Sequence, residues 1–223
     1  MSTNSFPAAV LWDMDGTLID SEPYWLQSES KLAASYGGTW TEADGQALIG
    51  FNLFNASDFL RNKFGITDLS TQDVINQLTD EVVEQLRIRL PWRPGALELL
   101  LELKRAGIKT ALVTMSMRSM AMTVVDAIDF PAFDVVVAGD DVINGKPDPE
   151  AYLKAAELLG VNARDCIAFE DSPAGLASAE AAGCHAVGVP NIVPLPPGNS
   201  RRIISSLTEV DIAQLGDLRI EGI

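Results

Sequence analysis

Two aspartates stand directly behind a short apolar run near the start of the chain, in the stretch AAVLWDMDGTLIDSEPYW, residues 8 to 25. Asp13 and Asp15 are separated by Met14 alone, and a glycine and a threonine follow Asp15 directly. Two carboxylates this close repel each other and lose hydration when enclosed, so packing alone gives no reason to place them at the end of a core strand. The pattern therefore indicates that a positively charged group binds there.

Polar residues also follow three later apolar runs. LVTM leads through Thr114 to Ser116, VVVAGDD leads to Lys146 in GKPDPE, and CIAFED ends in Glu170 and Asp171. Clustered carboxylates suit a hard divalent cation, and Mg²⁺ is the candidate because it keeps waters and also binds substrate phosphate. A lysine and a threonine suit phosphate oxygens, and the glycine of DGT lets backbone N–H groups approach an anion. Together these residues predict phosphoryl transfer.

The fold must bring these distant residues to one place. From about residue 95 onward, apolar runs alternate with helical patterns, which is typical of parallel strands joined by helices. The expected strands are 10–13, 109–115, 134–139, 166–171 and 185–190, and the expected helices are 95–107, 118–130, 147–160 and 173–183. The sequence thus predicts an α/β fold with a doubly wound, Rossmann-like parallel sheet, in which the loops after the strands form one ligand-binding rim.

Residues 22 to 89 interrupt this alternation. They contain amphipathic helical patterns at 23–37, around 54–65 and at 70–90, and no convincing strand. PWRPG, residues 91 to 95, follows them with prolines and glycine that suit a hinge. We therefore expect an α/β core domain of residues 1–21 and 90–223, and an inserted helical cap domain of residues 22–89.

The composition restricts the class of protein. Lys and Arg number 16 against 31 Asp and Glu, and the net charge of −15 opposes binding to nucleic acid and to anionic membranes. The N-terminus lacks the features of a signal peptide and no apolar run reaches the length of a membrane helix, so a cytoplasmic protein is expected. A monomer is the default expectation. Cys166 and Cys184 are expected to be buried, reduced thiols, and His185 is expected in the core or at a strand edge and not as a catalyst.

The residues singled out above resemble the motifs of a known family. DMDGTLIDSEP resembles the DxDGT motif of the haloacid dehalogenase superfamily of phosphohydrolases, and Thr114, Lys146 and the pair Glu170 and Asp171 match its three later motifs in order. The match covers essentially the whole chain. The helical insert is similar to the cap of the subgroup with phosphoglycolate phosphatases, sugar-phosphate phosphatases and β-phosphoglucomutase. The SEPYW continuation looks most like the sugar-phosphate members.

The resemblance implies a catalytic role for four residues. Asp13 would attack phosphorus and become an aspartyl phosphate. Asp15 would protonate the leaving oxygen and then take a proton from the water that hydrolyses the intermediate. Thr114 and Lys146 would hold the transferring phosphoryl group.

The resemblance also implies a metal site and substrate contacts. Mg²⁺ would be held by a carboxylate oxygen of Asp13, the backbone carbonyl of Asp15 and Asp171, with Glu170 acting directly or through water. Thr17 could orient Asp15. Further candidates for substrate contact are Gly16, Thr17, Met115 and Ser116.

Several of these residues have plainer interpretations. Asp171 before SPAG could cap the next helix, and Lys146 by itself would be an ordinary surface lysine. Ser116 and Arg118 suit substrate contact and a solvent-facing helix start equally well. Trp25 either packs the cap or reaches the substrate cavity.

The leading function is a Mg²⁺-dependent phosphatase that acts on a small phosphorylated metabolite, a sugar or polyol phosphate. A phosphosugar mutase of the β-phosphoglucomutase type is the alternative, and a phosphoglycolate phosphatase and a non-catalytic phosphate-binding module rank below it. Mutases of the family carry a basic residue just after a cap glycine, whereas Gly50 is followed here by FNLFNAS, without Lys or Arg. This departure favours hydrolysis, although Arg61 or Lys63 could compensate.

Overall fold

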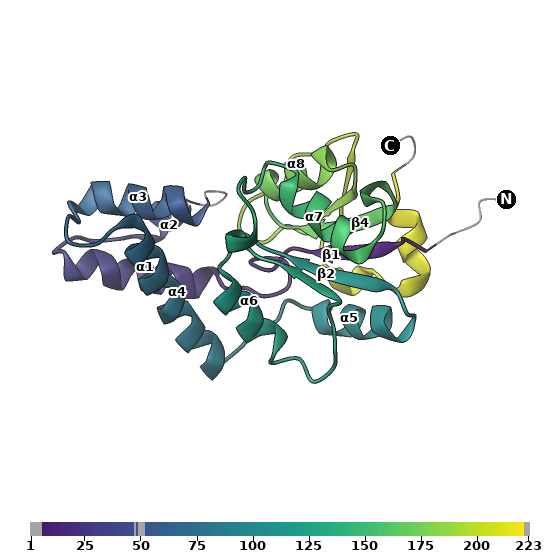
Figure 1. The fold of residues 1–223 in the computed structure, drawn as a ribbon, viewed down its shortest axis with the longest axis horizontal. Helices are drawn as coiled ribbons and strands as arrows, with labels where there is room; N and C mark the ends of the chain where they lie inside the picture. The colour runs from purple at the N-terminus through teal and green to yellow at the C-terminus, as the bar shows by residue number, and fades with distance from the viewer. Residues whose placement is uncertain (1–5, 47, 49–51, 221–223) are drawn as a thin grey trace.

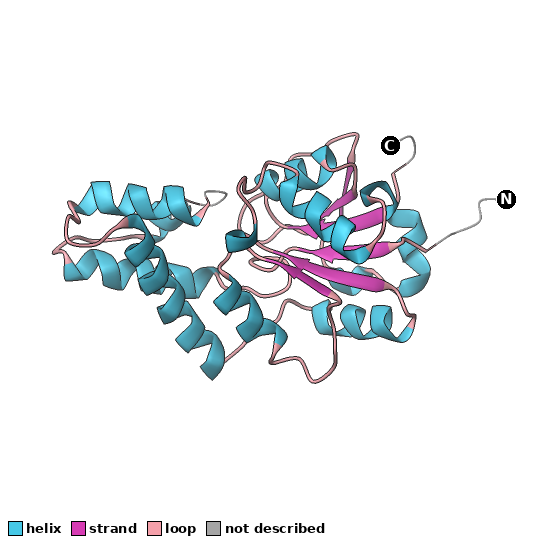
Figure 2. Cartoon of the chain, in the orientation of Figure 1, coloured by secondary structure: helices cyan, strands magenta, loops and turns pink. Residues whose placement is uncertain are grey.

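The computed structural model describes residues 6–46, 48 and 52–220, and it contains a six-stranded parallel sheet flanked by helices (Figures 1 and 2). The strands follow the spatial order β3-β2-β1-β4-β5-β6, and every neighbouring pair is parallel. Their bounds are β1 Ala9–Trp12, β2 Lys109–Val113, β3 Val135–Val137, β4 Cys166–Glu170, β5 His185–Gly188 and β6 Arg201–Ile203. The predicted doubly wound α/β fold is confirmed.

Helices cover both faces of the sheet, as Figure 1 shows. One face packs on α5 (Ala96–Arg105) and α6 (Arg118–Val125), and the other packs on α7 (Glu150–Leu159) and α8 (Pro173–Ala181). Along β1, Val10 and Trp12 point to the first face while Ala9 and Leu11 point to the second, as the period of a strand requires. Burial on both faces explains the continuous apolar runs of the sequence. Short 3₁₀ helices lie at Gly139–Asp141, Ala163–Asp165, Leu207–Glu209 and Ile212–Leu218.

Two elements of the α/β core differ from the prediction. Strand β6 was not expected, because two of its three residues are arginines and it lies at an edge of the sheet, where one side stays open. Helix α6 ends at Val125 and not at residue 130. After Asp126, the N–H groups of Ala127 and Ile128 bond carbonyls three residues back, which is a tighter turn, and Phe130 packs on the core.

Four helices between β1 and α5 form a separate lobe beside the sheet, visible in Figure 1. They are α1 Glu22–Ser35, α2 Glu42–Gln46, α3 Leu53–Phe64 and α4 Thr71–Ile88; the short α2 was not predicted. Leu32, Trp40, Leu60 and Leu78 belong to a hydrophobic cluster of their own in this lobe. The second half of α4 belongs instead to the cluster of the sheet. The boundary of a cap domain at residues 22–89 stays a prediction.

The chain enters and leaves this lobe through two segments that lie side by side. The N–H of Asp20 donates to the carbonyl of Pro91 at 2.8 Å, and the N–H of Arg93 donates to the carbonyl of Leu18 at 3.0 Å. Between these bonds Ile19 and Trp92 form an antiparallel bridge. The two connections therefore form a small two-stranded ribbon, called here the paired linkers, close to the end of β1.

The two cysteines and the histidine are buried, as predicted. Burial raises the pKa of the Cys166 thiol to about 12, which keeps it protonated. No helix in the part of the chain that the structure describes is both long and apolar enough to cross a membrane.

Candidate active site

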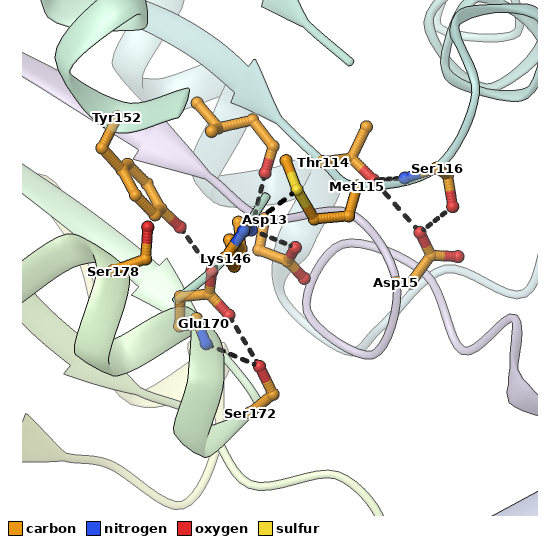
Figure 3. Close-up of polar contacts among 12 residues, drawn as sticks. Asp13, Asp15, Thr114, Met115, Ser116, Lys146, Tyr152, Glu170, Ser172 and Ser178 are labelled. Carbon is orange, nitrogen blue, oxygen red and sulfur yellow. Dashed lines mark hydrogen bonds and ion pairs between the residues drawn. The ribbon is translucent and has the colours of Figure 1, made fainter. Parts of the chain in front are cut away.

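The residues predicted to do chemistry come together at the carboxyl ends of three adjacent strands (Figure 3). Asp13 directly follows β1, and its N–H donates to the carbonyl of Phe169 at 3.0 Å. Thr114 directly follows β2, and Glu170 is the last residue of β4. Because β1 lies between β2 and β4, these side chains share one rim, as a parallel sheet requires.

Lys146 lies at the centre of a buried ion cluster. Its Nζ is 2.7 Å from Asp13 Oδ1 and 2.6 Å from Glu170 Oε1. It also donates to the carbonyl of Val113 at 2.9 Å. Burial lowers the pKa of Lys146, but Asp13 and Glu170 raise it more, so the pKa stays above its ordinary value and the ammonium stays charged. With 6% of its side chain exposed, Lys146 is not an ordinary surface lysine.

Asp13, Glu170 and Asp171 form a compact acidic cluster, in which one carboxylate oxygen from each residue lies within 4.8 Å of the other two. Burial, with the charge of Glu170, raises the pKa of Asp13 to about 7. Burial, with the charge of Asp13, raises the pKa of Asp171 as well. The buried Oδ2 of Asp13 has no hydrogen-bond partner among the described residues. A divalent cation fits this cluster, since it would supply the missing partner and offset the crowded negative charge.

Neighbouring residues orient the acidic cluster. The hydroxyl of Ser172 caps α8 by accepting from the N–H of Gly175 at 3.0 Å, so Asp171 is not the cap of that helix. Tyr152 is fully buried and donates from its hydroxyl to Glu170 Oε1 at 2.5 Å. Tyr152 could not be predicted from the sequence as a site residue, because a tyrosine inside a helix is usually a packing residue.

Asp15 turns towards Thr114 and Ser116 (Figure 3). Its Oδ2 accepts from the hydroxyl of Ser116 at 2.7 Å and from that of Thr114 at 3.2 Å. Its Oδ1 accepts from the hydroxyl of Ser21 and from the indole Nε1 of Trp25, the latter at 3.3 Å. The position of this carboxylate is therefore fixed jointly by groups from the core and by groups from the start of α1.

Not every predicted contact is present. Thr17 does not hydrogen-bond to Asp15: its hydroxyl is buried without a partner in the described chain, and Ser21 and Trp25 donate to Oδ1 of Asp15. Arg118 is turned away and pairs with Asp141.

A cavity of about 310 Å³ lies between the rim of the sheet and the helical lobe. Its floor includes Asp13, Asp15, Thr114, Lys146 and Asp171, with Met115 and Ser116 beside them. Its opposite wall comes from α1, α2 and α3 and includes Trp25, so the tryptophan reaches the cavity. Arg61 and Lys63 do not line it, and Gly50, on which the comparison with mutases depended, lies outside the described residues.

Gly16 passes directly against Asp171 of the acidic cluster, and we predict that Gly16→Ala is strongly destabilising. Its φ is +86°, and a Cβ there would lie 2.0 Å from Asp171 Oδ2. Gly37→Ala is the matched control, since Gly37 has a φ of +72° and no atom within 4 Å of such a Cβ. The control should lose about 1–2 kcal/mol of unfolding free energy, the cost of the left-handed backbone alone. Gly16→Ala should lose more unfolding free energy than this control and should also weaken Mg²⁺ binding. Urea unfolding measures both variants, and equal losses of unfolding free energy would contradict the expected clash.

Comparison with known proteins agrees with this arrangement. The family model of the haloacid dehalogenase-like hydrolases matches residues 7–183. The chain belongs to this family. It is 33% identical over 223 residues to hexitol phosphatase A of Escherichia coli, covering 95% of this chain and 97% of that protein. It is 34% identical over 180 residues to a phosphorylated carbohydrates phosphatase of Thermotoga maritima, covering 80% of this chain and 83% of that protein.

Among solved structures, CbbY of Rhodobacter sphaeroides in complex with xylulose-1,5-bisphosphate is similar, with a TM-score of 0.79 and 27% identity. The similarity covers 91% of this chain and 96% of the CbbY chain. Family membership and the named phosphatases together make this haloacid dehalogenase-like hydrolase a phosphoric monoester hydrolase.

Proposed function

We propose that this hydrolase is a Mg²⁺-dependent phosphatase that acts on the monophosphate ester of a small sugar or polyol through an aspartyl phosphate. The proposal rests on the arrangement of charged side chains at the floor of the cavity. There the unpartnered Oδ2 of Asp13 lies beside a charged lysine, within a cluster of carboxylates that fits a divalent cation. The named activities of hexitol phosphatase A and of the phosphorylated carbohydrates phosphatase support the substrate class.

In the first step a carboxylate oxygen of Asp13 forms a bond to phosphorus while the ester P–O bond breaks. Asp15 gives a proton to the leaving oxygen, and the alcohol departs. The ammonium of Lys146, already oriented by Asp13 and Glu170, binds the transferring phosphoryl oxygens. Thr114 lines the same floor, and its hydroxyl would turn from Asp15 to donate to a phosphoryl oxygen when the ester binds.

In the second step water attacks the phosphoryl group of the aspartyl phosphate and Asp15 takes up the proton of that water. The P–O bond to Asp13 breaks, inorganic phosphate leaves and the carboxylate is regenerated. Asp15 lines the cavity, and the hydroxyl of Ser116 and the indole of Trp25 hold its carboxylate there.

Mg²⁺ would be held by Asp13, Asp171 and the backbone carbonyl of Asp15, with Glu170 acting directly or through water. When bound, this ion supplies positive charge that offsets the charge of the phosphoryl group and of the nucleophile. The helices of residues 22–89 would act as a cap that excludes bulk water and shapes the site for the alcohol.

Hydrolysis is favoured over phosphate transfer between hydroxyls. A mutase must bind a second phosphate from the cap, and the two basic residues that could compensate have other partners. Arg61 pairs with Asp58 and donates to the carbonyl of Leu69, while Lys63 pairs with Asp44. Neither residue lines the cavity.

The test is phosphate release from hexitol, hexose and glycolate phosphates with added Mg²⁺. We expect free phosphate from the hexitol and hexose esters at higher kcat/KM than from phosphoglycolate. Conversion of a hexose 1-phosphate to the hexose 6-phosphate without free phosphate would show a mutase instead. Release from no ester in the panel would overturn the proposed function.

A further inference from the structure

The wall of the cavity that faces the reaction centre carries negative charge. Glu22 and Glu29 line it from α1 and Glu42 lines it from α2. Lys146 is the only cation among the described residues that line the cavity, and it already contacts Asp13 and Glu170. The lobe residues that the structure does not describe, 47 and 49–51, are Ala, Ile, Gly and Phe, so they add no charge.

Glu29 is held rigidly in this wall. It lies seven residues after Glu22 on α1, which is about two helical turns, so both carboxylates lie on the same side of the helix. Its exposed fraction is 9%, and its Oε2 accepts from the indole Nε1 of the buried Trp40 at 2.7 Å. A carboxylate fixed in this way has little freedom to turn away from a ligand in the cavity.

The cations of the lobe lie elsewhere. Lys31 pairs with Glu81 at 3.2 Å, and Arg61 and Lys63 pair with aspartates of the lobe. Arg87 and Arg89 are exposed at the end of α4 and do not line the cavity. Nothing in the described wall could therefore balance the charge of a second anionic group on the substrate.

We propose that Glu29 is a specificity-determining residue that selects substrates by the charge of their alcohol part. It accepts hydrogen bonds from hydroxyl or ammonium groups and excludes a second phosphate or a carboxylate, a preference called here the charge rule. This inference rests on the proposed phosphatase function. Like charges brought together in a partly dehydrated site repel strongly, which is how a binding site rejects the wrong ligand. Burial raises the pKa values of Glu22 and Glu29 to about 7, so the negative charge of this wall develops fully only above that pH.

Four esters that share a six-carbon framework test the charge rule: glucose 6-phosphate, glucosamine 6-phosphate, 6-phosphogluconate and glucose 1,6-bisphosphate. They are compared at about pH 8, where both glutamates are ionised. We expect glucosamine 6-phosphate and glucose 6-phosphate to have KM values at least about tenfold lower than those of the two esters with an added anion. The dissociation constants of the four esters for Asp13→Asn protein, measured by calorimetry, give the same order without turnover.

Glu29→Gln isolates the charge, because the amide oxygen of glutamine still accepts the hydrogen bond from Trp40. We expect this variant to reduce the ratio of KM values between anionic and uncharged esters by about tenfold. Glu84→Gln is the matched control, since Glu84 is an exposed residue of α4 that does not line the cavity, and its ratio should equal that of the wild type.

The outcomes separate the two proposals. Phosphate release with equal or lower KM for the anionic esters would overturn the charge rule and leave the phosphatase function standing. An unchanged ratio in Glu29→Gln would overturn the role of Glu29 in the same way. Absence of both release and binding for all four esters would overturn the proposed function, and the inference with it.

Discussion

Asp13→Asn is expected to reduce phosphate release by about 10⁴-fold or more, the scale on which removal of a nucleophile lowers kcat. An amide oxygen is a poor nucleophile and does not form the acyl phosphate on which both steps depend. The substitution preserves shape, and the amide oxygen still accepts a hydrogen bond from Lys146, whose Nζ lies 2.7 Å from Asp13 Oδ1. Release of inorganic phosphate from a hexitol phosphate, followed in time, measures the loss.

The same variant should fold as well as the wild type. Burial raises the pKa of Asp13 to about 7, so the ionised carboxylate destabilises the metal-free fold and a neutral amide does not. At about pH 8 the unfolding temperature of metal-free Asp13→Asn should therefore equal or exceed that of the wild type. Asp80→Asn, at an exposed position of α4, is the matched control and should keep full activity. Wild-type turnover by Asp13→Asn would refute its assignment as the nucleophile.

Removal of divalent metal should abolish activity, and added Mg²⁺ should restore it. Without the ion, the carboxylates of Asp13, Glu170 and Asp171 face one another with Lys146 as the only cation of the described chain among them. An anionic phosphate ester brought to this floor would meet uncompensated negative charge. The measurement is phosphate release after treatment with EDTA and after addition of Mg²⁺. Activity that persists in EDTA would contradict the metal site.

The affinity for Mg²⁺ should increase as the pH rises. The pKa of Asp13 is raised to about 7 and that of Asp171 is raised as well, so both bind protons more tightly when folded. Groups of this kind stabilise the metal-free protein at low pH, and their contribution falls as pH rises through the folded pKa. Mg²⁺ must displace these protons, so calorimetry should show tighter binding at about pH 8 than at about pH 5.5. Equal affinity at both values would exclude these carboxylates as ligands.

The sequence was enough to predict that the site residues meet in space, because the geometry of parallel strands determines where they lie. Buried parallel strands appear as uninterrupted apolar runs, and the residues after them must meet at one edge of the sheet. Asp13, Thr114 and Asp171 are found there for that reason. Lys146 follows the same rule at a greater distance, since it reaches the rim through a long loop after β3.

The contacts made by the helical lobe could not be predicted in the same way. An amphipathic pattern places Trp25 and Glu29 on α1, but it does not say which side of that helix faces the sheet. Only the tertiary packing brings the indole of Trp25 to Asp15 and the carboxylate of Glu29 to the cavity. Edge strand β6 was missed for a related reason, since its pairing with β5 and not its own composition makes it a strand.

The paired linkers bear on how such enzymes diversify. The chain passes from the core to the lobe at Ile19 and returns at Trp92, which pairs with Ile19. The two ends of the lobe therefore occupy neighbouring positions. Insertions, deletions and substitutions between those points can accumulate in evolution without moving any strand out of register. The residues at the rim of the sheet that cleave the phosphate ester can thus be inherited unchanged while changes in the helical lobe adapt descendants to other phosphorylated metabolites.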